Sequence, residues 1–279
     1  IEHADPRTSL LEQGCVARWH GIDFQQSKTL LKLETKALNA CFSADGRFMA
    51  TASPGGALQV WDLQESGLSG EIASDKGWES PVTFLGRSNH LVTRYGRGGG
   101  FREWDVTTGQ EIRSWRFSAP AFPRMSAFSP DGEWCVALGG EGTGQLFQLA
   151  TGQETRLDSL MKQANGSAFS PDGRSLAVVS VLGDCQLWDT ATARSTGTLK
   201  GFLQGTHSAA FSPDGRRLAV GSNGNEAIKL WDVESLQELL TLKGQGSMFD
   251  STGFSPDGNL LASRNSRGIL HIWRAPSFE

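Results

Sequence analysis

The feature that most constrains this chain is a unit that recurs along almost its whole length. The unit is most regular at residues 211–244, where a Ser-Pro-Asp-Gly turn is followed by three short runs rich in apolar and β-branched residues. A fourth run, at residues 207–211, leads into the turn. Runs of this kind, separated by Gly, Asn and Ser, are typical of β-strands. Each unit is therefore expected to contain four strands.

Two series of aromatic residues show how regularly the unit repeats. The first series, at the ends of the predicted first strands, recurs every 41 to 44 residues at Phe42, Phe84, Phe128, Phe169, Phe211 and Phe254. The second series, at the ends of the third strands, recurs every 41 to 43 residues at Trp19, Trp61, Trp104, Phe147, Trp188, Trp231 and Trp273. A period in the low forties with four short strands is the signature of propeller blades. The sequence therefore predicts an all-β chain, a closed seven-bladed β-propeller of four-stranded antiparallel blades.

The repeat places the units in one propeller domain at residues 1–37, 38–75, 76–119, 120–158, 159–200, 201–243 and 244–279. The first unit lacks its first strand, and its other strands are expected at residues 9–11, 15–19 and 29–33. The last unit has no fourth strand after Trp273, so the first and last blades are incomplete. Because the chain does not begin with Met, we expect it to be a fragment of a longer protein.

The residues that precede the first-strand Phe fit the narrow centre of a propeller. The space between neighbouring blades tapers towards the axis, so the innermost strand requires small side chains. The two positions before each Phe are small or β-branched in every case: Ala40-Cys41, Val82-Thr83, Ser126-Ala127, Ser167-Ala168, Ala209-Ala210 and Thr252-Gly253. The large aromatics of both series are expected to fill the wider part of the wedge.

The motifs at the strand ends resemble a known family. Trp61-Asp62, Trp104-Asp105, Trp188-Asp189 and Trp231-Asp232, together with four Phe-Ser-Pro-Asp-Gly turns, resemble those of WD-repeat β-propellers, and the resemblance covers nearly all of the chain. It implies a non-catalytic scaffold for protein–protein interaction. The turns and the tail at residues 273–278 also look like propellers of large bacterial proteins, some with a serine/threonine kinase domain. That resemblance implies an alternative, a regulatory or sensory domain of a larger signalling enzyme.

One part of the family pattern is weak in this chain. The pattern joins a Gly-His before the first strand, a Ser or Thr on the second strand and a turn Asp to the Trp through hydrogen bonds. Only Gly205-Thr206-His207 approximates the Gly-His, and the turns between second and third strands mostly lack Asp. We therefore expect stability to rest more on apolar packing than on a buried polar network.

Composition and motifs argue against several classes of function. Lys plus Arg number 26 and Asp plus Glu 30, a net charge of −4 without the basic excess of a nucleic-acid or anionic-membrane surface. No apolar run reaches transmembrane length. The five histidines fall in four different units, and no HExxH motif or nucleophile elbow is present. We expect no catalytic residue, cofactor, nucleic-acid partner or membrane contact in this fragment.

The four cysteines, Cys15, Cys41, Cys135 and Cys185, lie in four different units. Each falls inside a predicted strand, which favours a role as a small buried hydrophobe. No CxxC pair is present, so a structural zinc site or other metal centre is not expected. The lack of a disulfide framework favours a reducing compartment, and we expect the cytoplasm.

A protein or peptide partner is expected on one face. Loops that precede first strands and loops that join second to third strands emerge on the same face, because strand direction alternates. Large or charged candidates there are Trp78, Tyr95, Arg97, Phe122, Arg264 and Arg267, of types favoured in interfaces. The position four residues before the first-strand Phe gives a polar rim in four consecutive blades: Arg124, Asn165, His207 and Asp250. Either these are solvated loop ends, or they seat a charged side chain or an anion. The isolated domain is expected to be monomeric.

Overall fold

The computed structural model describes most of the chain as strands and tight turns. The described residues are 15–19, 27–32, 39–43, 45–52, 58–65, 67–73, 79–86, 89–95, 100–116, 125–139, 142–158, 160–202, 204–224, 226–244 and 248–274. They contain only β-strands and turns, without a helix. The chain divides into two compact units, Ile1–Phe122 and Pro123–Glu279, and each is described by itself.

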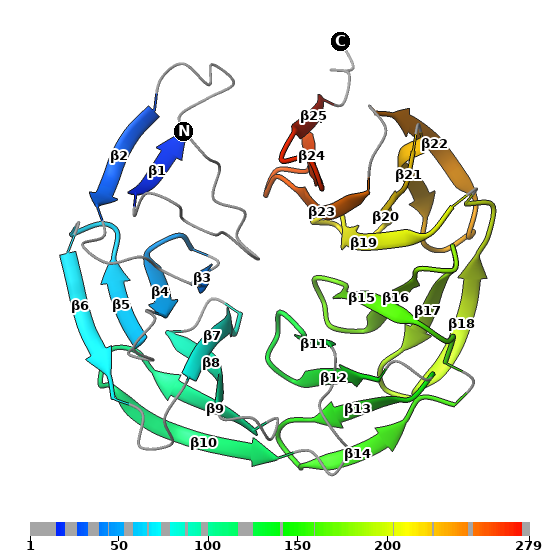
Figure 1. Cartoon of the computed structure of the whole chain (residues 1–279). Helices are drawn as coiled ribbons and strands as arrows, with labels where there is room; N and C mark the ends of the chain where they lie inside the picture. The colour runs from blue at the N-terminus through cyan, green and yellow to red at the C-terminus, as the bar shows by residue number, and fades with distance from the viewer. Residues whose placement is uncertain are drawn as a thin grey trace. The chain divides into compact units, whose positions relative to one another are not determined.

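The first unit contains three antiparallel sheets, which we call blades one to three (Figure 1). Blade one has two described strands, β1 (Cys15–Trp19) and β2 (Ser27–Lys32). Blade two consists of β3 (Asn39–Phe42), β4 (Phe48–Ala52), β5 (Leu58–Asp62) and β6 (Gly67–Ile72). Blade three consists of β7 (Glu79–Phe84), β8 (His90–Tyr95), β9 (Gly100–Asp105) and β10 (Gln110–Arg116).

The second unit contains blades four to seven, again with strands in sequential order. Blade four consists of β11 (Met125–Phe128), β12 (Trp134–Leu138), β13 (Gly144–Gln148) and β14 (Gln153–Arg156). Blade five consists of β15 (Ala164–Phe169), β16 (Ser175–Ser180), β17 (Cys185–Asp189) and β18 (Arg194–Leu199). Blade six consists of β19 (Thr206–Phe211), β20 (Arg217–Ser222), β21 (Glu226–Asp232) and β22 (Glu238–Lys243). Blade seven has three described strands, β23 (Phe249–Phe254), β24 (Leu260–Asn265) and β25 (Leu270–Arg274).

These sheets confirm the predicted fold class: the chain is all-β, built from the consecutive antiparallel blades of a β-propeller. Every repeat expected from the sequence contains one sheet. The third and fourth strands expected in the first repeat are β1 and β2, whereas the strand expected at residues 9–11 lies outside the described residues. Closure into a ring stays a prediction.

The Ser-x-Asp-Gly turns owe their shape to one hydrogen-bonded arrangement. In blade six, Ser212 Oγ donates to Asp214 Oδ1 at 2.5 Å and accepts from Arg217 N at 2.9 Å, while Asp214 Oδ1 also accepts from Arg216 N. Gly215 has φ of 72°, a left-handed conformation that favours glycine. The same Ser and Asp contacts recur at Ser43/Asp45, Ser129/Asp131, Ser170/Asp172 and Ser255/Asp257.

The Asp of each Trp-Asp pair organises the turn after the third strand. In blade six, Asp232 Oδ1 accepts hydrogen bonds from Ser235 N at 2.8 Å and Ser235 Oγ at 2.7 Å. Asp105 does the same with Thr107, and Asp189 with Thr192. The two residues of the Trp-Asp pair therefore have different roles: the Trp packs between blades, and the Asp carboxylate fixes the turn that follows.

These turns make stability depend on pH. Hydrogen bonds from the serine hydroxyls hold the pKa of Asp45, Asp172, Asp214 and Asp257 below the usual aspartate range. A lowered folded-state pKa gives stability that is present above the unfolded pKa of about 3.9 and is lost as pH falls through the folded pKa. We expect a steady Tm above about pH 5 and a progressive fall below about pH 4. Thermal melts from pH 7 to pH 3 test this, with Asp214→Asn showing a lower Tm at pH 7 and a shallower fall. A Tm that stays constant down to pH 3 would contradict the role given to these turns.

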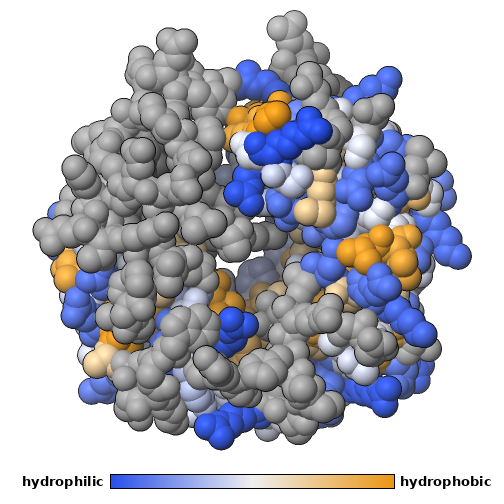
Figure 2. Space-filling model, in the orientation of Figure 1, coloured by the Kyte–Doolittle hydropathy of each residue, from blue (hydrophilic) through white to orange (hydrophobic). Residues whose placement is uncertain are grey.

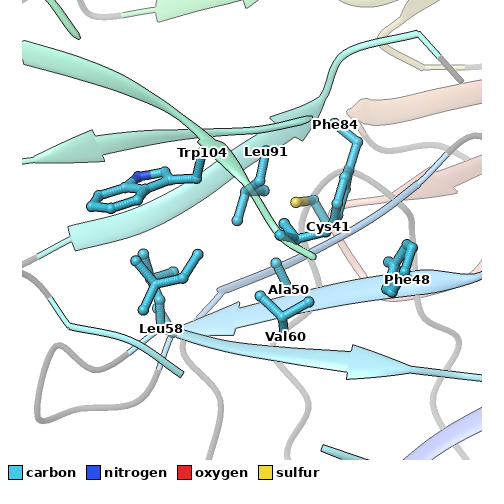
Figure 3. Packing of buried hydrophobic residues seen from close by; sticks show 11 residues of the cluster. Cys41, Phe48, Ala50, Leu58, Val60, Phe84, Leu91 and Trp104 are labelled. Carbon is cyan, nitrogen blue, oxygen red and sulfur yellow. The ribbon is translucent and has the colours of Figure 1, made fainter. Parts of the chain in front are cut away.

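Apolar wedges between neighbouring blades form the core. Figure 3 shows the wedge in the first unit, where Cys41, Ala50 and Val60 of blade two face Phe84, Leu91 and Trp104 of blade three. Equivalent clusters join blades four and five, five and six, and six and seven. Trp188 and Trp231, members of the second aromatic series, are 1% and 5% exposed. The aromatics thus fill the wedges, as the repeat predicts.

Small residues let the inner strands approach one another. Ala209 and Ala210 of β19 are 4% and 2% exposed, and β19 contacts both β15 and β23. Ser208 Oγ donates to Phe249 O at 2.9 Å and lies 2.7 Å from Thr252 Oγ1 of β23. Cys41, Cys135 and Cys185 are buried free thiols, and burial raises the pKa of each. These cysteines act as small core residues.

Among the described residues, the third-strand Trp of blades two and three has a polar partner. Trp61 Nε1 donates to Thr51 Oγ1 at 3.0 Å, and Trp104 Nε1 donates to Thr93 Oγ1 at 2.9 Å. In both blades the Thr stands two residues after the second-strand residue that pairs with the Trp. In blades five and six this position holds Val178 and Val220, and Nε1 of Trp188 and Trp231 has no partner among the described residues.

Blade three extends this contact with a residue that sequence reasoning missed. Glu79 is fully buried, and its Oε1 accepts from Thr93 Oγ1 at 2.5 Å and from Trp104 Nε1 at 3.3 Å. Its Oε2 lies 3.9 Å from Nη1 of Arg102, which is 1% exposed. The expectation of a weak polar network therefore fails in blade three, because a glutamate on the first strand accepts hydrogen bonds from both the second-strand Thr and the third-strand Trp.

The cost of exchanging Thr and Val should depend on whether the Trp Nε1 loses or gains an acceptor. Thr51→Val is expected to cost about 1 kcal/mol, because the part-buried Nε1 of Trp61 loses its acceptor. Val178→Thr offers Trp188 Nε1 an acceptor and should be tolerated better than Val179→Thr, the neighbouring buried control. Urea unfolding of the three variants measures the differences. Equal losses at Val178 and Val179 would show that Trp188 gains nothing from the hydroxyl.

Candidate functional site

The second unit has two sets of connections at opposite ends of its strands. The loop face consists of the described loops that precede first strands or join second to third strands. These are residues 139, 142–143, 157–158, 160–163, 181–184, 200–202, 204–205, 223–224 and 266–269, with Gly244 and Met248. We call the tight turns at residues 129–133, 149–152, 170–174, 190–193, 212–216, 233–237 and 255–259 the turn face. The candidate site lies on the loop face, where the inner strands begin.

Three of the predicted rim residues are extra residues of β-bulges. The pairing of β15 with β16 shifts between Ala164 and Gly166, which leaves Asn165 without a paired residue. The same kind of register shift leaves His207 of β19 and Asp250 of β23 without a paired residue. A bulge re-aims the side chain of its extra residue, and bulges occur often beside functional sites. Blades five, six and seven therefore each present one polar bulge residue at the same structural position.

Contacts connect these bulge residues with one another and with Arg264. Asn165 Nδ2 donates to His207 Nδ1 across the two blades at 3.0 Å, so the neutral imidazole carries its proton on Nε2. Asp250 Oδ1 lies 3.7 Å from Nη2 of Arg264. Burial lowers the pKa of His207, and the Asn223 side chain and the Asp250 carboxylate oppose that shift. These residues form a polar cluster in which the histidine is neutral at pH 7.

The cluster retains hydrogen-bonding capacity. Asn165 Oδ1, His207 Nε2 and Arg264 Nε are buried atoms that have no hydrogen-bond partner among the described residues. A buried polar group without a partner costs free energy that a bound group recovers. Asn165 and His207 are only partly buried as residues, and the Arg264 side chain is 42% exposed.

Exposed apolar side chains are distributed unevenly between the two faces. Val181 (38%), Leu182 (62%), Met248 (37%) and Ile269 (44%) are exposed on the loop face. None of the large hydrophobics exposed among the described residues lies on the turn face. Figure 2 shows apolar side chains between the sheets of blades five and six and beside blade seven. Exposed apolar groups ringed by polar residues are typical of protein interaction sites.

The other predicted site residues have different positions. Tyr95 is 5% exposed, its ring lies under the guanidinium of Arg102 at 4.7 Å, and Gly100 packs against it. It therefore offers little surface to a partner. Arg267 is exposed on the loop between β24 and β25. Trp78, Arg97, Phe122 and Arg124 lie outside the described residues. Sequence reasoning missed Val181, Leu182, Met248 and Ile269, although apolar residues in loops are themselves a readable signal.

Metal-ligand groups, membrane-spanning helices and His90 give no second candidate site among the described residues. Within the described ranges, no group of three His, Cys, Asp or Glu residues is placed to hold a metal ion. The part of the chain that the structure describes contains no helix long and apolar enough to span a membrane. His90 Nδ1 lies 2.6 Å from Glu103 Oε1, and Glu103 Oε2 accepts from Arg113 Nε at 2.5 Å, so this histidine belongs to an ion-paired cluster on blade three.

Comparison with known proteins supports a repeat of this type. Residues 27–62 and 193–232 match the family model described as WD domain, G-beta repeat. Each match begins near the outer strand of one blade and ends with the Trp-Asp of the next, at Trp61-Asp62 and Trp231-Asp232. No curated protein matches the chain. Propellers of WD repeats generally serve as scaffolds for protein–protein interaction.

Proposed function

We propose that this chain is a non-catalytic interaction module that holds a protein or peptide partner on the loop face of its second unit. The observation that carries the proposal is the placement of the exposed apolar residues. Val181, Leu182, Met248 and Ile269 lie on the loop face, whereas the turn face has Ser, Asp, Gly and Arg. Burying apolar surface contributes about 25 cal/mol per Å² and is a main source of affinity in an interface.

The polar cluster supports the same face. Asn165, His207 and Asp250 project from successive bulges, and Arg264 adds a cation beside Asp250. An interface commonly combines apolar anchors with a few placed polar groups, which give it specificity. The blades that support the loops are tightly packed, so the face is preorganised and little conformational entropy is lost on binding.

Partner capture from a lysate of the source organism tests the proposal. We expect the double variant Leu182→Ser/Ile269→Ser to lose captured proteins that the unchanged chain retains. Leu239→Ser is the matched control, because Leu239 is 50% exposed but lies on the outer strand β22. Arg124→Ala/Asp250→Ala should also weaken capture while leaving the thermal melt unchanged. Capture that survives the loop-face variants and is lost on altering the turn face would overturn the assignment.

A further inference from the structure

The two faces of the second unit differ in charge. Among the described residues at the turn face and the strand ends beside it, ten carboxylates stand against the five cations Arg174, Arg194, Arg216, Arg217 and Arg274; the carboxylates are Asp131, Glu133, Glu154, Asp172, Asp189, Asp214, Asp232, Glu234, Glu238 and Asp257. On the loop face and the strand ends beside it, the cations Arg156, Lys162, Lys200, Lys243, Arg264 and Arg267 stand against Asp158, Asp184, Glu226 and Asp250. Glu226 is itself 3.6 Å from Lys229. The loop face is therefore the side on which an acidic partner is attracted.

The cations and the apolar residues come together on blade seven. We call Met248, Arg264, Arg267 and Ile269 the blade-seven patch. Ser266 N donates to Met248 O at 2.8 Å, which holds the loop before β23 against the loop between β24 and β25. Arg264 is at the end of β24 beside this connection. Apolar and cationic groups therefore lie side by side on one blade.

A buried asparagine fixes the shape of the patch. Asn265 is 1% exposed, and its Oδ1 accepts hydrogen bonds from Arg267 N and Ile269 N, both at 3.0 Å. Asn265 N donates to Ile269 O at 3.0 Å, and Gly268 takes φ of 78° to complete the turn. Because this loop is held by its own hydrogen bonds, Arg267 and Ile269 are presented to a partner with little loss of backbone entropy.

Both arginines have donors to spare. The Arg264 guanidinium is 3.7 Å from Asp250, beyond hydrogen-bonding distance, and its buried Nε has no hydrogen-bond partner among the described residues. Arg267 is exposed and has no ion-pair partner within the described ranges. A guanidinium presents five donors in a planar fork that matches a carboxylate in two-point contact. One carboxylate, Asp250, stands against two arginines at this patch, so the patch has an excess of positive charge.

From this arrangement we infer that the blade-seven patch binds an acidic segment of a partner protein in which an apolar side chain neighbours an Asp or Glu. Arg264 and Arg267 receive the carboxylate, and Met248 and Ile269 cover the apolar side chain. The inference rests on the proposed function, because it names the chemistry of the partner on the same face.

Selection from a phage-displayed random 12-residue peptide library on the immobilised chain tests the inference. We expect the enriched peptides to contain Asp or Glu beside an apolar residue. A synthetic peptide of the leading sequence should bind Arg264→Glu/Arg267→Glu about tenfold or more weakly, with the loss measured by fluorescence anisotropy. Added salt should weaken its binding to the unchanged chain. Arg216→Glu, an exposed arginine reversed on the turn face, is the matched control and should bind normally.

The outcomes separate this inference from the proposed function. The enriched peptides could lack acidic residues and still bind the Leu182→Ser/Ile269→Ser variant more weakly. That result would overturn the inference that the partner segment is acidic, while the loop face would remain the binding surface. Peptides whose binding is unaffected by all loop-face variants would overturn both. A library that yields no enriched peptide, or an affinity unchanged in Arg264→Glu/Arg267→Glu, counts against the inference. Circular dichroism and thermal melts establish that each variant is folded.

Discussion

Trp188→Ala is expected to lower the free energy of unfolding by about 3–5 kcal/mol. Trp188 is 1% exposed and packs in the wedge between blades four and five, beside Val136, Leu176 and Val178. Truncation removes a large apolar surface from the core and leaves a cavity that the rigid sheets on either side fill poorly. A loss of this size is a large part of a typical domain stability of about 5–15 kcal/mol.

Urea unfolding followed by circular dichroism measures the loss. Leu182→Ala is the control, because this residue is 62% exposed and its truncation should change stability by less than about 0.5 kcal/mol. Trp188→Phe keeps most of the apolar volume and also removes the unpartnered Nε1, so it should cost less than the Ala variant. A Trp188→Ala loss below about 1 kcal/mol would show that the wedges do not carry the stability assigned to them.

Glu79→Ala should have an effect of similar size through a different cause. The change removes the acceptor of Thr93 and Trp104 and the carboxylate beside the buried guanidinium of Arg102. Removing one partner of a buried ion pair typically costs about 3–5 kcal/mol, because the remaining charge is left in a poorly solvated place. Glu111, with Oε2 at 3.4 Å from Arg102 Nε, and the ring of Tyr95 compensate only part of this loss.

Glu79→Gln separates the hydrogen bonds from the charge. The amide oxygen still accepts from Thr93 and Trp104, while the negative charge beside Arg102 is gone. Comparing urea unfolding of the two variants gives the share of each contribution. If Glu79→Ala costs no more than about 1 kcal/mol, the buried network is not a main source of stability in blade three.

The repeat made much of the fold predictable, because each strand type carries its own local signal. Small residues mark the inner strand, Trp marks the third, and Ser, Asp and Gly mark the turns. The strands of blades two to seven follow that order. Glu79 was not predictable, since its role depends on Thr93 and Arg102 on two other strands. The pairing of third and fourth strands shifts register beside Trp61, Trp188 and Trp231 but stays regular in blade four, where Phe147 replaces the Trp. A pattern of residue types did not predict this difference.

The candidate site was predictable only in part. Asn165, His207 and Asp250 occupy one repeat position, so their common location followed from the period. The pairing of Arg264 with Asp250 and the burial of Tyr95 depend on side-chain packing, which the period does not report. The exposure of Val181 and Leu182 depends on the conformation of the loop between β16 and β17. Hydrogen bonds from Leu182 N to Ser180 Oγ and from Thr206 Oγ1 to the carbonyls of Ser180 and Asp184 hold that loop, and the contact with Thr206 comes from another blade.

The bulges at Asn165, His207 and Asp250 also bear on how such a surface can evolve. A bulged residue is excluded from the ladder, so its side chain is under no requirement to fit a cross-strand neighbour or to keep the strand register. Single substitutions at these three positions alter the hydrogen-bonding groups of the loop face one blade at a time. The recognition chemistry can therefore diverge between related proteins while the blades that support it keep the same core.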